Sequence, residues 1–320
     1  MDKIIERIER EAGIPGLVTI LAERLAPTDL QSILLETYRL RSSNLSPGAV
    51  LSNYRTSRLV RPSAVPPALL LKWEQVAFSQ LPQEFEALAL APVCPLGASS
   101  VVAPIDQNWA IAAARNVEVV SDSTNVLALE CAARRRELLR SDQKSAQPVH
   151  LAASHRLLRA QQYTSPHSVA HFSSFVLCSA GRDQGSLQFE IAALRLHVQF
   201  YLRALCAFLG VSVPLCFSVT PFRQSVSDQL VETLLLSPIR AEFGAIECYI
   251  DSQRTSGRGY YSGLCFHIHA TNASGERFEL VDGGSVDWVQ KYLSNAKERL
   301  VISGLGSERL CQEFGKDHTG

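Results

Sequence analysis

Two arginines, far apart in the chain, carry the strongest chemical signal in this sequence. Arg309 follows a hydrophobic segment and two glycines, Gly304 and Gly306, in the stretch VISGLGSERLC, and it begins what reads as a helix. Glycines let another group approach the backbone closely, and a guanidinium has a planar fork of donors that matches phosphate. Arg159 lies in the β-like stretch HRLLRAQQY (155–163) beside a loop. The hypothesis is that both guanidinium groups bind one phosphate-bearing ligand.

Composition limits what else the chain could do. Of its 320 residues 46% are hydrophobic, which allows one large domain with an accessory part or two domains, and Lys+Arg (31) balance Asp+Glu (31). No bulk charge therefore attracts nucleic acid or membrane. The opening MDKIIERIEREAG lacks the apolar centre of a secretory signal, and no apolar run reaches the roughly 18 residues of a membrane span. We expect a soluble cytoplasmic protein.

The cysteines and histidines do not predict a metal site. Eight cysteines are present but no CxxC pair, which fits a reduced compartment and argues against structural zinc. His171, His267 and His269 lie on or beside predicted strands without the spacing typical of metal ligands, so we interpret them as structural histidines. No metal ligand is predicted.

The elements that must position these residues fall into two regions. Residues 1–43 show two helical patterns, and the Ser- and Pro-rich stretch 44–67 reads as a connector without long regular elements. We expect a helical region with its connector over 1–70 and a main domain over 71–320. In the main domain helices are predicted at 125–139 and 187–209 and strands at 117–120, 155–163, 172–180, 244–249, 264–270, 278–281 and 300–303. The segment TSPHSVAH joins the second and third strands, and TNASGE joins the fifth and sixth. This order indicates an α+β fold with a largely antiparallel sheet.

Two of these stretches resemble signature motifs of the class II aminoacyl-tRNA synthetase catalytic core. Leu158-Arg159-Ala160-Gln161, a loop to His171 and then Phe172-Ser-Ser-Phe175 resemble the second motif, an Arg-x-Glu strand followed by a loop and a Phe-containing strand. Gly304-Leu-Gly306-Ser-Glu308-Arg309-Leu310 resembles the third, a glycine-rich strand that runs into a helix carrying Glu-Arg.

Three further stretches are similar to the histidyl branch of that class. GRGYYSGLCFHIHA (257–270) resembles its RGLDYYTG segment, LVDGGSVDWVQKYL (280–293) its GGRYD segment, and VVSDSTNVLAL (119–129) its R-P-E-G-T stretch. In this order the matches extend from about residue 90 to 311. The resemblance implies a mainly antiparallel sheet flanked by helices, and a homodimer formed through a first motif within 74–105, with Pro92 or Pro95 as its proline.

The resemblance also implies a reaction and a set of site residues. An amino-acid carboxylate would attack the α-phosphorus of ATP in the presence of Mg²⁺, and the protein would position and neutralise the charges. Arg159 would bind the α-phosphate and the carboxylate, and Arg309 the terminal phosphates. The implied ATP-binding residues are Arg159, Gln161, His171, Phe172, Gly304, Gly306 and Arg309. The implied amino-acid-binding residues are Asp122, Thr124, Ser174, Cys178, Arg258, Tyr260, Tyr261, Gly283 and Gly284.

Several positions depart from the family pattern. Gln161 stands where the second motif has Glu, and Ser174 and Cys178 stand where a histidyl enzyme reads its substrate. The catalytic Arg and the Asp of the RGLDYY segment fall on Ser256 and Gly259, with Arg254 and Arg258 close enough to substitute. The GGRYD segment keeps both glycines and Asp287 but has Ser285 and Val286 for Arg and Tyr. Histidine is therefore not the expected substrate.

Three of the assigned residues also have an ordinary structural interpretation. Arg159 could be a surface arginine, Asp122 could cap the following helix instead of binding an ammonium group, and Tyr261 could serve packing alone.

The favoured function is ATP-dependent formation of an aminoacyl adenylate by a synthetase paralogue. Since the chain ends soon after the third motif, we expect no anticodon recognition, and the acceptor would be a carrier, a small molecule or a tRNA. The alternatives are a non-catalytic regulatory subunit like that of ATP phosphoribosyltransferase and a module that senses an amino acid or nucleotide. Arg309 favours ATP binding because a buried guanidinium without an anion would be costly.

Overall fold

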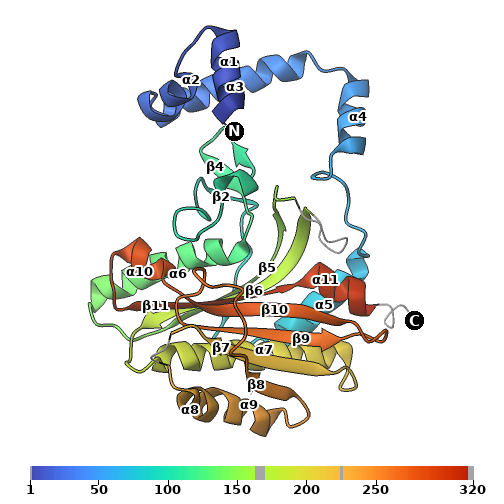
Figure 1. Cartoon of the computed structure of the whole chain (residues 1–320), viewed down its shortest axis with the longest axis vertical. Coiled ribbons are helices and arrows are strands. Elements are labelled where there is room, and N and C mark those ends of the chain that lie inside the picture. Colours follow the sequence, from blue (N-terminus) through green and yellow to red (C-terminus); the bar gives the residue numbers. More distant parts are fainter. Residues whose placement is uncertain (1, 163–169, 224–225, 316–320) are drawn as a thin grey trace.

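A computed structural model describes residues 2–162, 170–223 and 226–315. Its centre is an eight-stranded sheet, in which β1–β5 and β7–β8 pair in parallel and all other neighbours are antiparallel. In spatial order the strands are β1 (Glu86–Ala87), β5 (Val149–Leu158), β6 (His171–Arg182), β11 (Glu298–Gly306), β10 (Arg277–Val286), β9 (Leu264–Thr271), β7 (Leu215–Pro221) and β8 (Glu247–Ile250). The expected α+β fold with a mainly antiparallel sheet is confirmed (Figure 1).

Helices cover both faces of this sheet. On one face lie α7 (Gln188–Leu209), α5 (Pro67–Ser79) and α11 (Ser307–Phe314), which bury side chains such as Leu194 and Trp73 against the sheet. On the other lie α6 (Ser123–Ser141) and α10 (Trp288–Leu293), packed through residues such as Leu127 and Trp288. Strand side chains alternate between the two cores, so Phe266 and Ile268 face α7 while Cys265 faces α6. The α6 face also carries the candidate site described below.

The helix predicted at 187–209 is confirmed as α7. It begins after Leu187, whose φ is 57°, and ends at Gly210, whose φ of 85° favours glycine. Among the helices in the described part of the chain it is the one long and apolar enough to cross a membrane, but 61% of its most apolar window is buried inside the protein. It is a buried core helix.

Several short elements complete the main body. They include a three-stranded sheet of β2 (Val93–Pro95), β4 (Val117–Val119) and β3 (Ala112–Ala113), and a 3-10 turn at Gln107–Trp109. Beside β8 lie α8 (Asp228–Val231), a π-helical turn (Glu232–Leu236) and α9 (Ser237–Glu242). The sheet strand β7, which pairs with β9 and β8, has no counterpart among the predicted strands.

The N-terminal helices stand apart from the main body (Figure 1). They are α1 (Asp2–Ala12), α2 (Leu17–Thr19), a π-helical turn (Ile20–Arg24), α3 (Pro27–Ser43) and α4 (Pro47–Thr56), and α2, α3 and α4 contain no buried residue. The expectation of a connector without long elements over 44–67 was wrong for α4. Ser46 caps it by accepting a hydrogen bond from Ala49 N at 3.2 Å, and Pro47 starts it with a favourable φ. The division at residue 70 stays a prediction.

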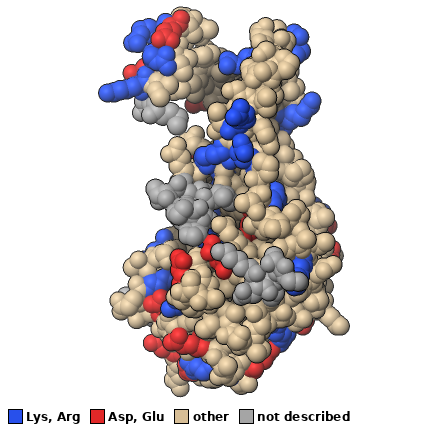
Figure 2. Space-filling view, turned by 90° about the vertical axis from the view of Figure 1, so that its right-hand side faces the viewer, with Lys and Arg blue, Asp and Glu red and all other residues tan. Residues whose placement is uncertain are grey.

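The surface shows no single charged face in the view of Figure 2, in line with the balanced composition. Lys and Arg lie on the N-terminal helices and on the segment below them, and both signs are mixed over the main body. All eight cysteines are free thiols, and seven of them are buried. Burial raises the pKa of the Cys265 thiol to about 12 and that of Cys94 to about 11, so both stay protonated at neutral pH.

Candidate functional site

A cavity of about 560 Å³ opens on the α6 face of the sheet. Its volume is in the range of small-molecule sites in proteins. Its walls come from the ends of β5 and β11, from β6 and β10, and from the start of α6 and α11. Of the residues predicted to form the site, the cavity is lined by Asp122, Thr124, Arg159, Gln161, Phe172, Ser174, Tyr260, Tyr261, Gly304, Gly306 and Arg309. The two arginines, 150 positions apart, thus lie on one cavity.

Arg159 is held firmly at the wall of this cavity. The strand expected at 155–163 ends at Leu158, so Arg159 follows β5, where its N donates to Ala170 O at 2.7 Å. Its Nε donates to Ser121 O at 2.8 Å, and its Nη2 lies 3.1 Å from Asp122 Oδ2. The guanidinium also lies over the Phe172 ring, 5.5 Å from the centroid. The predicted connection TSPHSVAH falls largely on residues 163–169, outside the described residues.

Asp122 has two different partners. Its Oδ1 accepts from Thr124 N at 2.9 Å and from Thr124 Oγ1 at 2.7 Å, which makes Asp122 the N-cap of α6. Its Oδ2 accepts from Arg159. The capping interpretation is therefore correct, and the same carboxylate also faces the cavity, where an ammonium group could replace the guanidinium.

Arg309 lies where β11 ends and α11 begins. Its guanidinium is exposed, and its Nη1 donates to Glu279 O at 3.2 Å. The premise that this guanidinium is buried was wrong, so it carries no penalty for a missing anion. The neighbouring Glu308 is buried and forms an ion pair with Arg156. A Cβ on Gly304 would lie 3.3 Å from Val176 Cγ1, so the strand leaves little space there.

Five predicted site residues do not line the cavity. His171 lies between Arg61 O, 2.5 Å from its Nε2, and Arg156, 3.0 Å from its Nδ1. Cys178 is buried, with its Sγ 3.6 Å from Thr124 O, and Arg258 lies over the Phe222 ring at 5.3 Å. The other two are Gly283 and Gly284.

Those two glycines are needed for packing within the sheet. A Cβ on Gly283 would lie 2.7 Å from Ile302 O, and one on Gly284 would lie 2.6 Å from Leu264 O. Tyr261 packs on Gly284 and under Arg254, whose Cζ is 5.8 Å from its ring centroid. Tyr261 therefore serves packing and also lines the cavity.

The sequence interpretation missed several charged residues at the cavity wall, namely Glu279, Asp282 and Glu308. Arg254, next to that wall, is 4% exposed and its Nη2 donates to Asp282 Oδ1 at 2.9 Å. Burial opposes ionisation of Asp282, but the hydrogen bond from His267 and the charge of Arg254 lower its pKa below the usual value. Burial raises the pKa of Glu279 and lowers that of His269 to about 4.

The fold is similar to that of the catalytic core of class II aminoacyl-tRNA synthetases of the histidyl type. No family model and no curated protein matches the sequence. Among solved structures, an ATP phosphoribosyltransferase regulatory subunit/histidyl-tRNA synthetase from Bacillus halodurans aligns with a TM-score of 0.58 and 12% identity over 79% of this chain and 82% of that one. Apo histidyl-tRNA synthetase from S. aureus aligns with a TM-score of 0.57 and 12% identity, over 81% and 70% of the two chains. At this identity the likeness shows the fold.

Proposed function

We propose that the cavity binds ATP and an amino acid and joins them as an aminoacyl adenylate. The observation that carries this proposal is that Arg159, Arg309 and Asp122 line one cavity. They come from three separate elements, and a phosphate-bearing ligand with an amino-acid partner needs this combination of two cations and one anion.

The residues present fit ATP and Mg²⁺. The exposed guanidinium of Arg309 would hold the terminal phosphates, and Arg159 would hold the α-phosphate and the attacking carboxylate. Gly304 and Gly306 line the cavity with bare backbone of β11, and Phe172 offers a flat apolar surface. Glu308, which lines the cavity beside Arg309, would hold Mg²⁺, whose charge would offset that of the leaving pyrophosphate.

The Arg159–Asp122 ion pair supports a zwitterionic substrate. An amino acid offers a carboxylate to Arg159 and an ammonium group to Asp122, so both partners of the pair remain compensated when the ligand enters. The site is partly buried, with the Arg159 side chain 33% exposed and that of Asp122 16% exposed. A ligand with a single charge would leave either Arg159 or Asp122 there without an opposite charge. Because Ser174 replaces a substrate-reading residue and Cys178 lies in the core, the amino acid would differ from histidine.

A regulatory subunit is the second candidate function. Gln161 takes the place of a carboxylate of the second motif, and Arg159 is already satisfied by Asp122 and Ser121 O. The solved structure from Bacillus halodurans also bears the description of a regulatory subunit. In this case the cavity would bind a ligand without catalysing its reaction. The class II fold is usually dimeric, and a homodimer formed within residues 74–105 fits either function.

The test is amino-acid-dependent exchange of pyrophosphate into ATP, measured with all twenty amino acids. We expect exchange with one or a few of them, and a loss of about 10²–10³-fold in Arg159→Met or Arg309→Met, the size typical for loss of a group that stabilises transition-state charge. Arg203 lies on the opposite face of the sheet, where it pairs with Glu242. Arg203→Met is therefore the matched control and should exchange pyrophosphate at the wild-type rate. ATP binding without exchange would favour the regulatory function, and a chain that binds no ATP would refute the activation proposal.

A further inference from the structure

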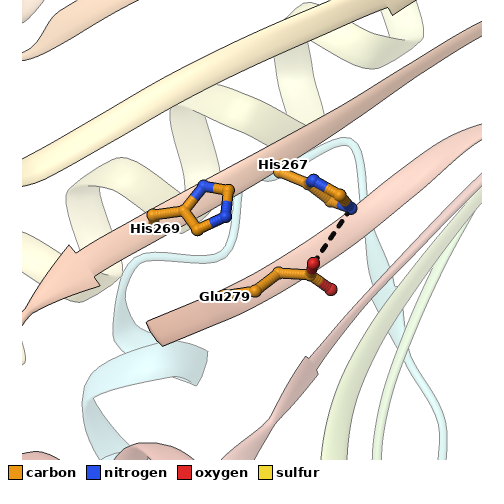
Figure 3. Close-up of side chains that lie close together, drawn as sticks. All are labelled: His267, His269 and Glu279. Atoms are coloured by element: carbon orange, nitrogen blue, oxygen red, sulfur yellow. Dashed lines mark ion pairs between the residues drawn. The ribbon is translucent and has the colours of Figure 1, made fainter. Parts of the chain in front are cut away.

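We propose that His267, His269 and Glu279 form a binding site for one divalent transition-metal ion, for which Zn²⁺ is the best match. The two histidines are alternate residues of β9, so both project from one face of the sheet. Glu279 lies on β10, directly opposite His269 in the antiparallel register. One donor atom from each of the three lies within 4.8 Å of the others, and Figure 3 shows the two rings and the carboxylate side by side.

An irregularity in β10 adds a second carboxylate to this face. The register shifts between Glu279 and Val281, so Glu279 pairs with His269 while Asp282 pairs with His267. In a regular strand, residues three apart would face opposite sides of the sheet. The extra residue, Leu280, therefore aims both carboxylates at the histidines, which is a common use of β-bulges near functional sites.

The contacts of the two histidines differ in a way that an ion would explain. His267 Nε2 lies 3.2 Å from Glu279 Oε2 and 3.4 Å from Asp282 Oδ1. His269 Nδ1 is shielded from solvent and has no hydrogen-bond partner among the residues that the structure describes. An ion pair of His267 with the carboxylates accounts for the first ring alone, whereas an ion bound among the three donor atoms would engage both rings.

The donor set indicates the class of ion. Two imidazoles and one carboxylate suit Zn²⁺ or Fe²⁺, whereas Mg²⁺ and Ca²⁺ prefer oxygen ligands throughout. Asp282, held by Arg254 at 2.9 Å, lies 3.4 Å from His267 Nε2 and would help to fix the orientation of that ring. The nearby cations are directed elsewhere, because Arg309 donates to the Glu279 carbonyl oxygen and Arg277 Nη2 to Cys216 Sγ at 3.4 Å.

The position of the site suggests what the ion would do. Glu279 and Asp282 both line the cavity of the proposed reaction. Three protein ligands leave a coordination position open, as in catalytic rather than structural zinc sites. An ion here would be reachable by a ligand in the cavity. The activation reaction proposed above requires none of these three ligands, so either proposal can be correct without the other.

The experiment is a titration of the chelator-treated full chain with Zn²⁺ by calorimetry, and with Co²⁺ followed by visible absorption. We expect one ion per chain. His269→Gln and Glu279→Gln should each weaken binding by about 100-fold or more, and Asp282→Asn by about 10–100-fold, the range for loss of a group that orients a ligand. His155→Gln is the matched control, because His155 is also a half-buried strand histidine, and its buried nitrogen has no partner among the residues that the structure describes. It lies four strands away on β5, so the variant should bind the ion as the wild type does.

Absence of stoichiometric binding, or equal affinity in the wild type and both ligand variants, would overturn the proposal. Circular dichroism establishes that each variant is folded. Should a variant fail to fold, X-ray absorption on the zinc-loaded wild-type chain decides by counting imidazole ligands: two support the site, and fewer refute it.

Discussion

Substitution in the buried ion pair between Arg135 and Glu298 should strongly lower the stability of the fold. Both side chains are fully buried, with Arg135 Nε 2.7 Å from Glu298 Oε2 and Nη2 3.0 Å from Oε1. The guanidinium also donates to the carbonyl oxygens of Gln147 at 2.5 Å and Ser145 at 2.9 Å. The pair joins α6, which starts at the Asp122 cap, to β11, which ends at Gly306. It therefore fixes two walls of the cavity relative to one another.

Replacing Arg135 by Met should lower the free energy of unfolding by about 3–5 kcal/mol, because a buried carboxylate and two carbonyl oxygens lose their donors. Replacing both partners, as in Arg135→Met with Glu298→Leu, should restore most of that loss, since no buried charge is then left without a partner. The measurement is urea denaturation followed by circular dichroism.

Arg134 provides the matched control one residue away. It pairs with Glu86 and Glu130, whose side chains are 58% and 43% exposed, so Arg134→Met should cost less than about 1 kcal/mol. The reasoning would be refuted if Arg135→Met cost as little as Arg134→Met. It would also be refuted if the double variant were as unstable as Arg135→Met alone.

Three further predictions concern other buried contacts. Gly283→Ala should destabilise the protein by about 1–3 kcal/mol because the added Cβ would overlap Ile302 O. Gly306→Ala should be close to neutral, since the nearest atom to its Cβ would be 3.7 Å away. The measurement is the denaturation midpoint of each variant. Ser307→Ala should cost about 1–3 kcal/mol by removing the acceptor, 3.0 Å away, of the buried Trp73 indole N–H, and a normal denaturation midpoint would contradict this. Burial lowers the pKa of His197 well below 6.5, so the unfolded chain binds a proton in mildly acidic solution that the folded chain does not. Stability should therefore fall as pH drops below about 6.5, and His197→Gln should reduce that slope in denaturation curves at a series of pH values.

Much of the fold could be predicted from local patterns. The spacing of Leu194, Val198, Leu202 and Leu205 predicted α7, and Gly210 predicted its end, because a helix that packs on a sheet needs an apolar stripe at this period. The hairpin around TNASGE followed from turn chemistry in the same way. The motifs placed Arg159 and Arg309 on a common cavity, although their roles there stay predictions.

The parts that failed depend on contacts distant in sequence. β7 lies in the middle of the sheet as a short apolar run, which periodicity does not distinguish from other buried segments. Arg309 was expected to be buried because its surroundings were unknown, and Arg135 showed no sign of a partner 163 positions away. The metal-binding hypothesis had a sequence signal that was not used: His-x-His on a predicted strand and Glu279 on the other strand of the same predicted hairpin.

The additional residue in β10 has a consequence for deletions at this position. Without Leu280 the strand would alternate regularly, and Glu279 and Asp282 would become next-but-one neighbours, roughly 7 Å apart along the strand. Both carboxylates would still lie opposite the same two histidines, because the pairs Glu279–His269 and Asp282–His267 would keep their register. Leu280 is buried in the hydrophobic core, so shortening the chain by this single residue would remove an apolar contact of β10 while leaving the acidic residues of the cavity wall in register with the histidines.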